Sequence, residues 1–394
     1  MAIAEKIRQF TEKSSWIRKM FEEGAIMKQR YGADRVYDFS LGNPDVPPPA
    51  AFHEALLRVC RNEQPGVHGY MANSGYPFVR EAIARRLSRE QGLAISGGDL
   101  LMTCGAAGAI NITLKAILNP GDEVILLAPY FVEYDFYLDN HGGVSRVVDT
   151  DAEFRLDFAA IEEAINDKTK AIIINSPNNP TGQIYSAGEL RRLGELLTAA
   201  GEKRGSAIYL ISDEPYRGIV FDGQSCPGIF PAYRQSIIVS SHSKDLSLPG
   251  ERIGFATVHP NIEDKESLLA ALTLANRILG FVNAPALMQR VVAELQEAPA
   301  AAETYARRRD IFCQILTDAG FQFQRPKGAF YLFPKTPIED DVKFCRLLQE
   351  ERILAVPGRG FGRQGHIRLA FCVSEQVIAA AADGFKKVME KARG

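Results

Sequence analysis

The sequence predicts an α/β fold with more than one domain. Short apolar runs, such as Val124–Ala128 and Ile237–Val239, are typical of strands that are buried on both faces of a parallel sheet. Longer segments between them carry helix signals, such as the capping box of Ser186 and Glu189 in a helix expected to end at Gly201. A chain of 394 residues is too long for one hydrophobic core, so we expect two domains.

Composition narrows the class of protein. A formal net charge of -2 gives no electrostatic reason to bind nucleic acid or an anionic membrane, so neither partner is expected. The six cysteines are scattered without a Cys-x-x-Cys pair, and the six histidines include no His-x-x-x-His pair. We therefore expect free thiols in a reducing compartment and no metal site. The N-terminus has no long apolar stretch, so we expect a cytoplasmic protein.

Two loops near the N-terminus hold candidate contact residues. A short strand that starts near Tyr37 runs into a proline-rich loop containing Gly42, and Tyr70 lies in a polar loop before an amphipathic helix. A glycine can bring its backbone N–H close to a ligand, but it also serves as a plain turn residue. A lone tyrosine is usually a half-buried ring. Neither residue indicates a function without the rest of the chain.

The next two strands end in small and aromatic residues. After the strand Leu100–Thr103, a helix opens with Gly105, Ala106 and Ala107. Small residues at a helix start leave N–H groups bare for an anion, although they also allow simple close packing. Phe131 follows the strand Val124–Ala128, and its ring could stack on a planar ligand or belong to the core.

Polar residues follow the two central strands. Asn179 stands in an Asn-Pro-Thr-Gly turn after the run Ala171–Asn175, while Asp213 and Tyr216 follow the run Ala207–Ser212. A carboxylate at such a place is often a helix cap or a surface group. Ligands of open α/β sheets nevertheless bind at the carboxyl ends of the strands, which makes these residues candidates for a site.

The most informative stretch follows the run Ile237–Val239. Ser241, Ser243 and Arg252 could together hold a phosphate, the arginine through a two-pronged charge-assisted contact. Lys244 stands between them at a strand end, where an amine beside a phosphate suits a Schiff base with pyridoxal phosphate. An isolated Ser-x-Ser-Lys would more often be a surface loop, but Gly-x-Arg-x-Gly at this distance is rarer by chance.

Two signals near the C-terminus point in different directions. The residues from Gly360 to Gly365 satisfy G-x-G-x-x-G, but a strand rather than a helix is expected after them, so we interpret them as a glycine-rich loop. Arg368 lies inside that expected strand, Ile367–Phe371, where an unpaired charge is costly. A substrate carboxylate or a structural acid would pair it.

These motifs resemble those of the class I and II aminotransferases, which are pyridoxal-phosphate enzymes of fold type I. The Lys244 and Asn179 motifs carry the resemblance, which extends in family order from Gly42 to Arg368. It implies a mostly parallel seven-stranded sheet flanked by helices and a smaller α+β domain. The implied domains are an N-terminal arm with part of the small domain (1–45), a large cofactor domain (46–284) and a C-terminal small domain (285–394).

The resemblance also implies a role for each candidate residue. Lys244 would be the catalytic lysine, and Tyr70 would reach the cofactor phosphate of the partner subunit in a homodimer with shared sites. The other residues implied to bind the cofactor are Gly105, Ala106, Ala107, Phe131, Asn179, Asp213, Tyr216, Ser241, Ser243 and Arg252. Those implied to bind the substrate carboxylate are Gly42, Asn179 and Arg368.

The implied activity is transfer of an amino group between an L-amino acid and a 2-oxo acid by a ping-pong mechanism. Aspartate is the first donor expected, because it is common in this subgroup. The same residues also serve carbon–sulfur lyases and cyclopropane-forming synthases, and release of pyruvate and ammonia would favour a lyase. A non-catalytic sensor usually carries an added DNA-binding domain, for which no basic segment is present. A nicotinamide dehydrogenase would rest on the glycine-rich loop alone.

Overall fold

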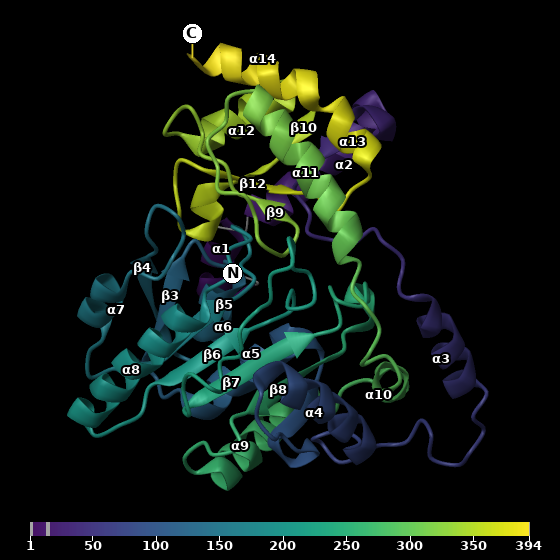
Figure 1. Ribbon diagram of the computed structural model, residues 1–394, viewed down its shortest axis with the longest axis vertical. Coiled ribbons are helices and arrows are strands. Elements are labelled where there is room, and N and C mark those ends of the chain that lie inside the picture. The colour runs from purple at the N-terminus through teal and green to yellow at the C-terminus, as the bar shows by residue number, and fades with distance from the viewer. Residues whose placement is uncertain (1–2, 13–15, 394) are drawn as a thin grey trace.

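A seven-stranded sheet forms the centre of the computed structural model, which describes residues 3–12 and 16–393 (Figure 1). The strand order is β2-β8-β7-β6-β5-β3-β4, and β8 alone runs antiparallel to its neighbours. The strands are β2 (Leu100–Thr103), β3 (Glu123–Ala128), β4 (Val144–Asp149), β5 (Thr169–Asn175), β6 (Tyr209–Asp213), β7 (Ser236–Ser241) and β8 (Gly254–Val258). The predicted α/β class and seven-stranded sheet are confirmed.

Alternating apolar side chains bury both faces of this sheet. In β3, Ile125 and Leu127 point into one core while Val124 and Leu126 point into the other, as the period of a strand requires. One face is covered by α4 (Pro77–Gln91), α7 (Phe158–Ala164), α8 (Ala187–Arg204) and α10 (Ala286–Ala293). The other is covered by α5 (Gly105–Ile117), α6 (Glu133–Asn140) and α9 (Lys265–Ile278).

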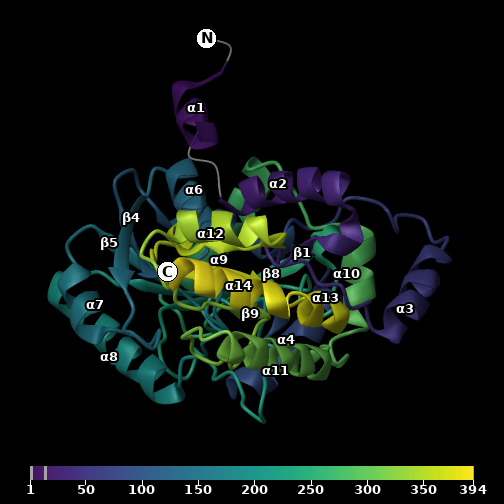
Figure 2. The ribbon, with the colours of Figure 1, turned by 90° about the horizontal axis from the view of Figure 1, so that it is seen from above.

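A second hydrophobic core lies above the large sheet in the view of Figure 1 and contains residues from both ends of the chain (Figures 1 and 2). Its strands are β1 (Tyr37–Asp38) paired with β10 (Ile353–Leu354), and β11 (Val356–Pro357), β12 (Ile367–Ala370) and β9 (Tyr331–Leu332) in an antiparallel sheet. Its helices are α11 (Ala302–Asp318), α12 (Asp341–Glu350), α13 (Glu375–Ala380) and α14 (Ala382–Arg393). The boundaries expected at 45/46 and 284/285 stay a prediction.

The remaining helices belong to the N-terminal part and the linking loops. They are α1 (Glu5–Glu12), α2 (Trp16–Tyr31), α3 (Ala50–Cys60) and the 3-10 turns Ala33–Arg35, Gly97–Asp99, Pro249–Glu251 and Gly358–Phe361. The last turn leads into β12, so a strand follows the glycine-rich loop as expected. One expectation is wrong: α8 ends at Arg204 rather than Gly201, because Gly205 adopts the left-handed conformation that caps it.

The chain after β1 connects the second core to the edge of the large sheet. Phe39 donates its N–H to Leu354 and accepts one from Ala370, at 3.0 and 2.8 Å. Phe39 is fully buried, and its ring lies 4.8 Å from that of Phe312 on α11. The residues directly after it, Ser40 to Gly42, are thereby held at the point where the two cores meet.

We predict that Phe312→Ala lowers the free energy of unfolding by about 3–5 kcal/mol, because it leaves a cavity where Phe312 packs on Phe39 and Phe385. Urea denaturation of the purified protein measures the loss. Leu57→Ala is the control, since Leu57 is 53% exposed and should change the value by less than about 0.5 kcal/mol. Equal effects of the two variants would contradict the prediction.

Candidate active site

Three neighbouring strands end at the same edge of the large sheet and bring the predicted polar residues together. Asn175 at the end of β5 pairs in register with Asp213 at the end of β6. Lys244 follows the end of β7, the next strand in the sheet. Parallel strands deliver their carboxyl ends to one edge, which is where α/β sheets bind ligands.

Lys244 places its amine against the backbone of the N-terminal loop. Its Nζ donates a hydrogen bond of 2.7 Å to the carbonyl of Gly42. Burial lowers the pKa of Lys244 to about 8, and the positive charges of Arg368 and Arg252 act in the same direction, against an opposing effect of Cys372. A lysine with this pKa is partly neutral near neutral pH, as a nucleophile or general base must be.

Asp213 is a buried carboxylate with one free oxygen. Its Oδ2 accepts a hydrogen bond of 2.6 Å from the hydroxyl of Tyr134, whereas Oδ1 is buried without a partner among the described residues. Burial raises the pKa of Asp213 to about 7; the Tyr134 bond lowers it and the charge of Glu214 raises it. A buried acceptor left without a donor costs free energy, so Oδ1 fits a ligand that brings an N–H.

Arg368 is 2% exposed and meets no acid within hydrogen-bonding distance in the described part of the chain. It donates instead to Asn179 Oδ1 at 3.1 Å and to the carbonyl of Ser40 at 2.6 Å. Its Nε is buried without a partner. The structural ion pair that the sequence left open is therefore not formed, and the guanidinium keeps an N–H for a carboxylate.

Asn175 holds this arrangement in place and was not identified from the sequence. Its side chain accepts from the backbone N–H of Asn179 at 2.6 Å and donates to the carbonyl of Asp213 at 2.8 Å. It therefore connects the turn after β5 to the end of β6. Only its position as the last residue of an apolar strand could have signalled this role.

Tyr216 and Gly42 meet at Tyr331, a residue that sequence reasoning also missed. The hydroxyls of Tyr216 and Tyr331 lie 2.8 Å apart, and both rings are buried. A Cβ at Gly42 would lie 1.9 Å from the Tyr331 hydroxyl oxygen, so only glycine lets the N-terminal loop pass here. Glycine is therefore required at position 42 for close approach.

The candidate phosphate residues gather at the start of α5. Gly105 has a φ of +75°, and a Cβ there would lie 2.9 Å from a terminal nitrogen of Arg252. The backbone N–H of Ser243 donates to Ser241 Oγ at 3.4 Å. Ala106 and Ala107 form the first turn of α5 and offer backbone N–H groups alone. The structure thus brings Arg252 beside the small-residue helix start, as the phosphate prediction requires.

Phe131 and Tyr70 lie differently with respect to this site. The ring of Phe131 contacts that of Tyr134 edge-on at 5.6 Å, which places it next to the residue bonded to Asp213. Tyr70 is 92% exposed, so its ring is not buried among the other candidates. The protomer therefore does not bring Tyr70 into its own site.

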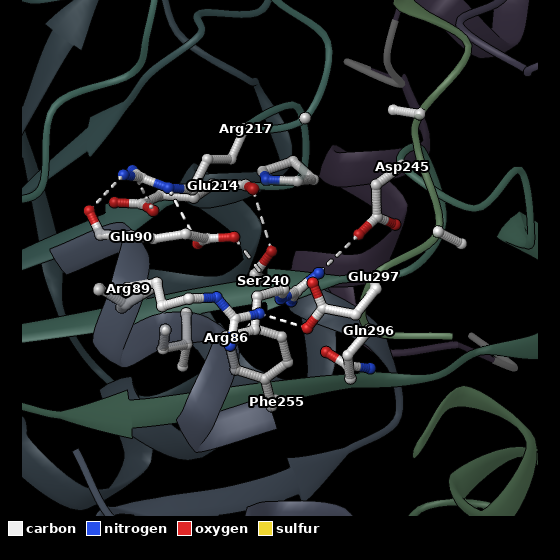
Figure 3. A pocket seen from close by; sticks show the side chains of 16 residues that line it. Arg86, Arg89, Glu90, Glu214, Arg217, Ser240, Asp245, Phe255, Gln296 and Glu297 are labelled. Atoms are coloured by element: carbon white, nitrogen blue, oxygen red, sulfur yellow. Dashed lines mark hydrogen bonds and ion pairs between the residues drawn. The ribbon is translucent and has the colours of Figure 1, made fainter. Parts of the chain in front are cut away.

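Residues of α4 line one side of a cavity of about 290 Å³, and ion pairs cross it (Figure 3). Arg217 pairs with Glu214 and Glu90 at 3.0 and 3.1 Å. Arg86 pairs with Asp245 and Glu90 at 3.3 and 3.6 Å. The network thus runs from Glu214 to Asp245 through two residues of α4.

This network lies directly behind the site. Glu214 follows Asp213 in the chain, and Asp245 follows Lys244. Glu214 and Asp245 line the cavity, whereas Asp213 and Lys244 are not among its lining residues. The ion pairs therefore connect the segments that follow β6 and β7 to α4.

Two negative findings apply to the described residues. No group of three or more potential metal-ligating side chains occurs among them. None of the helices in residues 3–12 and 16–393 is both long and apolar enough to cross a membrane.

Solved structures define the class of fold. An amino transferase from Eubacterium rectale superposes with a TM-score of 0.96 at 37% identity, with full coverage of both chains. The aspartate aminotransferase from Thermus thermophilus with maleate superposes with a TM-score of 0.87 at 29% identity, over 98% of this chain and 100% of that one. The fold is that of the aspartate-aminotransferase-like enzymes.

Sequence comparison gives the family. The family model described as aminotransferase class I and II matches residues 34–385. The aspartate/prephenate aminotransferase of Thermus thermophilus is 33% identical over 374 residues, which cover 93% of this chain and 94% of that protein. The chain belongs to the class I and II aminotransferases, a family of transaminases that uses pyridoxal phosphate.

We predict that the reactivity of Lys244 toward pyridoxal phosphate rises with pH through a midpoint near 8. The reason is that only the neutral amine attacks an aldehyde, and burial lowers the pKa of this lysine to about 8. Borohydride trapping between pH 6 and 10, followed by peptide mass spectrometry, measures the profile. A yield of trapped Lys244 that stays constant from pH 6 to pH 10 would refute the assignment.

Proposed function

We propose that this transaminase binds pyridoxal phosphate at Lys244 and moves an amino group from an L-amino acid to a 2-oxo acid in two alternating half-reactions. The observation that carries the proposal is that three side chains able to bind a ligand lie at one edge of the large sheet. These are an amine of lowered pKa on Lys244, an unpartnered oxygen on Asp213 and an unpartnered N–H on Arg368.

The residues present fit the cofactor. Asp213 Oδ1 is a free acceptor suited to a protonated pyridine nitrogen. Tyr216 and Asn179 would bind the ring oxygen. Ser241, Ser243, Arg252 and the N–H groups of residues 105–107 would hold the phosphate. When bound, the cofactor supplies an aldehyde for the amino group and a ring that delocalises electrons released at the substrate.

Side chains of this protein carry out the substrate binding and the proton transfers. Arg368 and Asn179 bind the substrate α-carboxylate and thereby orient the Cα–H bond. Lys244 removes the proton from Cα as a general base and returns one as a general acid when the 2-oxo acid is converted. Its lowered pKa lets it do both near neutral pH.

A homodimer would complete the site. Tyr70 is 92% exposed in the single chain, which supports a role at the cofactor phosphate of the partner subunit. Leu274 and Ile278 on α9 are also exposed apolar residues, as expected for an interface. The six free thiols support the proposed cytoplasmic location.

Aspartate is the first donor to test, because several relatives are aspartate aminotransferases. The names of these relatives also favour a transaminase over the carbon–sulfur lyase that the motifs allow. Release of pyruvate and ammonia from a cysteine-type donor without an acceptor acid would instead show a lyase.

We predict that Lys244→Ala retains bound cofactor but loses at least about a thousandfold in turnover, since it removes both the amine and the general base. Visible absorbance measures cofactor binding, and 2-oxo acid formation measures activity. Lys203→Ala, on the exposed face of α8, should keep both. Near-normal turnover of the Lys244→Ala protein would contradict the proposal.

We predict that Arg368→Lys raises the KM for the amino donor roughly tenfold or more, because lysine cannot make the two-pronged contact with the α-carboxylate. Steady-state kinetics with a saturating acceptor acid measures the change. Arg363→Lys is a matched control, as Arg363 pairs with Asp149 at the surface. An unchanged KM in Arg368→Lys would remove this residue from substrate binding.

A further inference from the structure

His242 is a buried residue of the Lys244 segment that the mechanism does not use. It lies between Ser241 and Ser243, the two serines proposed to hold the phosphate, and its side chain is fully buried. Its Nδ1 lies 3.2 Å from Asp245 Oδ2, whereas Nε2 is buried without a hydrogen-bond partner in the described part of the chain. Because a carboxylate oxygen accepts hydrogen bonds, Nδ1 carries a proton and donates to Asp245.

The unpartnered nitrogen makes a histidine unfavourable at this position. A buried polar atom without a partner destabilises the folded state. The ring lies beside that of Phe255, with 6.2 Å between the ring centroids, and a leucine or phenylalanine there would avoid the cost. An apolar side chain could not, however, donate to Asp245. We therefore interpret this hydrogen bond as the reason for a histidine at position 242.

The backbone of His242 closes the same segment on itself. Its N–H donates to the carbonyl of Ile253 at 3.1 Å, and its carbonyl accepts the N–H of Leu248 at 3.2 Å. Together with the ring bond to Asp245, one residue thus contacts three later points of the chain. Lys244 lies within the loop that these contacts enclose.

The enclosed loop contains two residues in a left-handed backbone conformation. Ser247 has a φ of +55° and Arg252 a φ of +50°, although neither is a glycine. Such conformations are strained and persist only where the surrounding contacts hold them. The contacts of His242 are among those that keep this loop in the shape that brings Lys244 and Arg252 to one site.

Asp245 connects the histidine to the ion pairs behind the site (Figure 3). Its Oδ2 also accepts a hydrogen bond from Arg86 Nη1 at 3.3 Å, and Arg86 belongs to α4. Burial raises the pKa of Asp245, but His242, Arg86 and a backbone N–H together lower it by more, so the carboxyl is ionised near neutral pH. The carboxylate directly after Lys244 is therefore held from two sides.

We propose that His242 is a positioning residue for Lys244, because its Nδ1–H bond to Asp245 fixes the turn at residues 242–244 and thereby directs the amine toward the cofactor aldehyde. The inference rests on the proposed function, which assigns the cofactor to Lys244. A reacting group misplaced by about 1 Å loses up to about a hundredfold in rate. The bond should therefore affect the reactivity of Lys244.

Two amide substitutions at His242 test the bond with similar chemistry. The amide nitrogen of asparagine stands where histidine has Nδ1, one bond from Cγ, whereas that of glutamine stands where histidine has Nε2. His242→Asn should therefore keep the bond to Asp245, and His242→Gln should lose it.

The measurement is the rate at which Lys244 of the full-length protein, freed of cofactor, reacts with added pyridoxal phosphate. Samples are quenched with borohydride at set times near pH 8, where the amine is partly neutral, and the Lys244 peptide is quantified by mass spectrometry. We expect His242→Asn to react within about threefold of the wild-type rate and His242→Gln to react at least about tenfold more slowly.

His259 provides a matched control. It is also buried, and its Nδ1 accepts from the N–H of Asn261 at 2.9 Å. Its own N–H donates to Ser236 at the start of β7, whereas Lys244 follows the end of that strand. His259→Gln should therefore leave the trapping rate of Lys244 at the wild-type value, even where it lowers stability.

The outcomes separate this inference from the function on which it rests. If wild-type Lys244 forms no adduct, the proposed function fails. If it does, but His242→Gln reacts at the wild-type rate or His242→Asn is as slow as His242→Gln, the positioning role fails alone. NMR of the histidine ring nitrogens in the wild-type protein needs no variant to fold. A proton on Nδ1 of His242 supports the proposal, and a proton on Nε2 alone would overturn it.

Discussion

The hydrogen bond from Lys244 to the carbonyl of Gly42 joins the parts of the protein on which the site depends. The lysine comes from the end of β7 in the large sheet, whereas the glycine follows β1, which pairs with a strand of the second core. The bond exists only when both cores are folded and in contact. Activity is therefore tied to the packing of two units that draw on distant parts of the sequence.

The site keeps its polar groups at a cost in stability. Arg368 Nε and Asp213 Oδ1 are both buried without partners in the described residues. Each would destabilise the folded chain unless a ligand completed it. We interpret these gaps as the imprint of a cofactor and a substrate, because they converge on the edge that also holds a lysine of lowered pKa.

The ion pairs behind the site explain how such groups stay in position. Glu90 pairs with both Arg86 and Arg217. These two arginines in turn pair with Asp245 and Glu214, the residues that follow Lys244 and Asp213. Sequence reasoning identified Lys244 and Asp213 but none of this support. Arginines and glutamates in an amphipathic helix resemble ordinary surface residues until the fold shows what they face.

The sequence by itself determined the α/β class, the strand ends with their polar residues and the family, because strand periodicity and the Lys244 and Asn179 motifs are local. Only the tertiary structure showed which side chains outside the motifs contact the site residues. Tyr134 on Asp213, Asn175 between two strand ends and Tyr331 against Gly42 are contacts between residues far apart in the chain or inside aromatic and apolar runs. Such side chains have no local pattern of their own, since only packing determines whether a buried polar atom finds a partner.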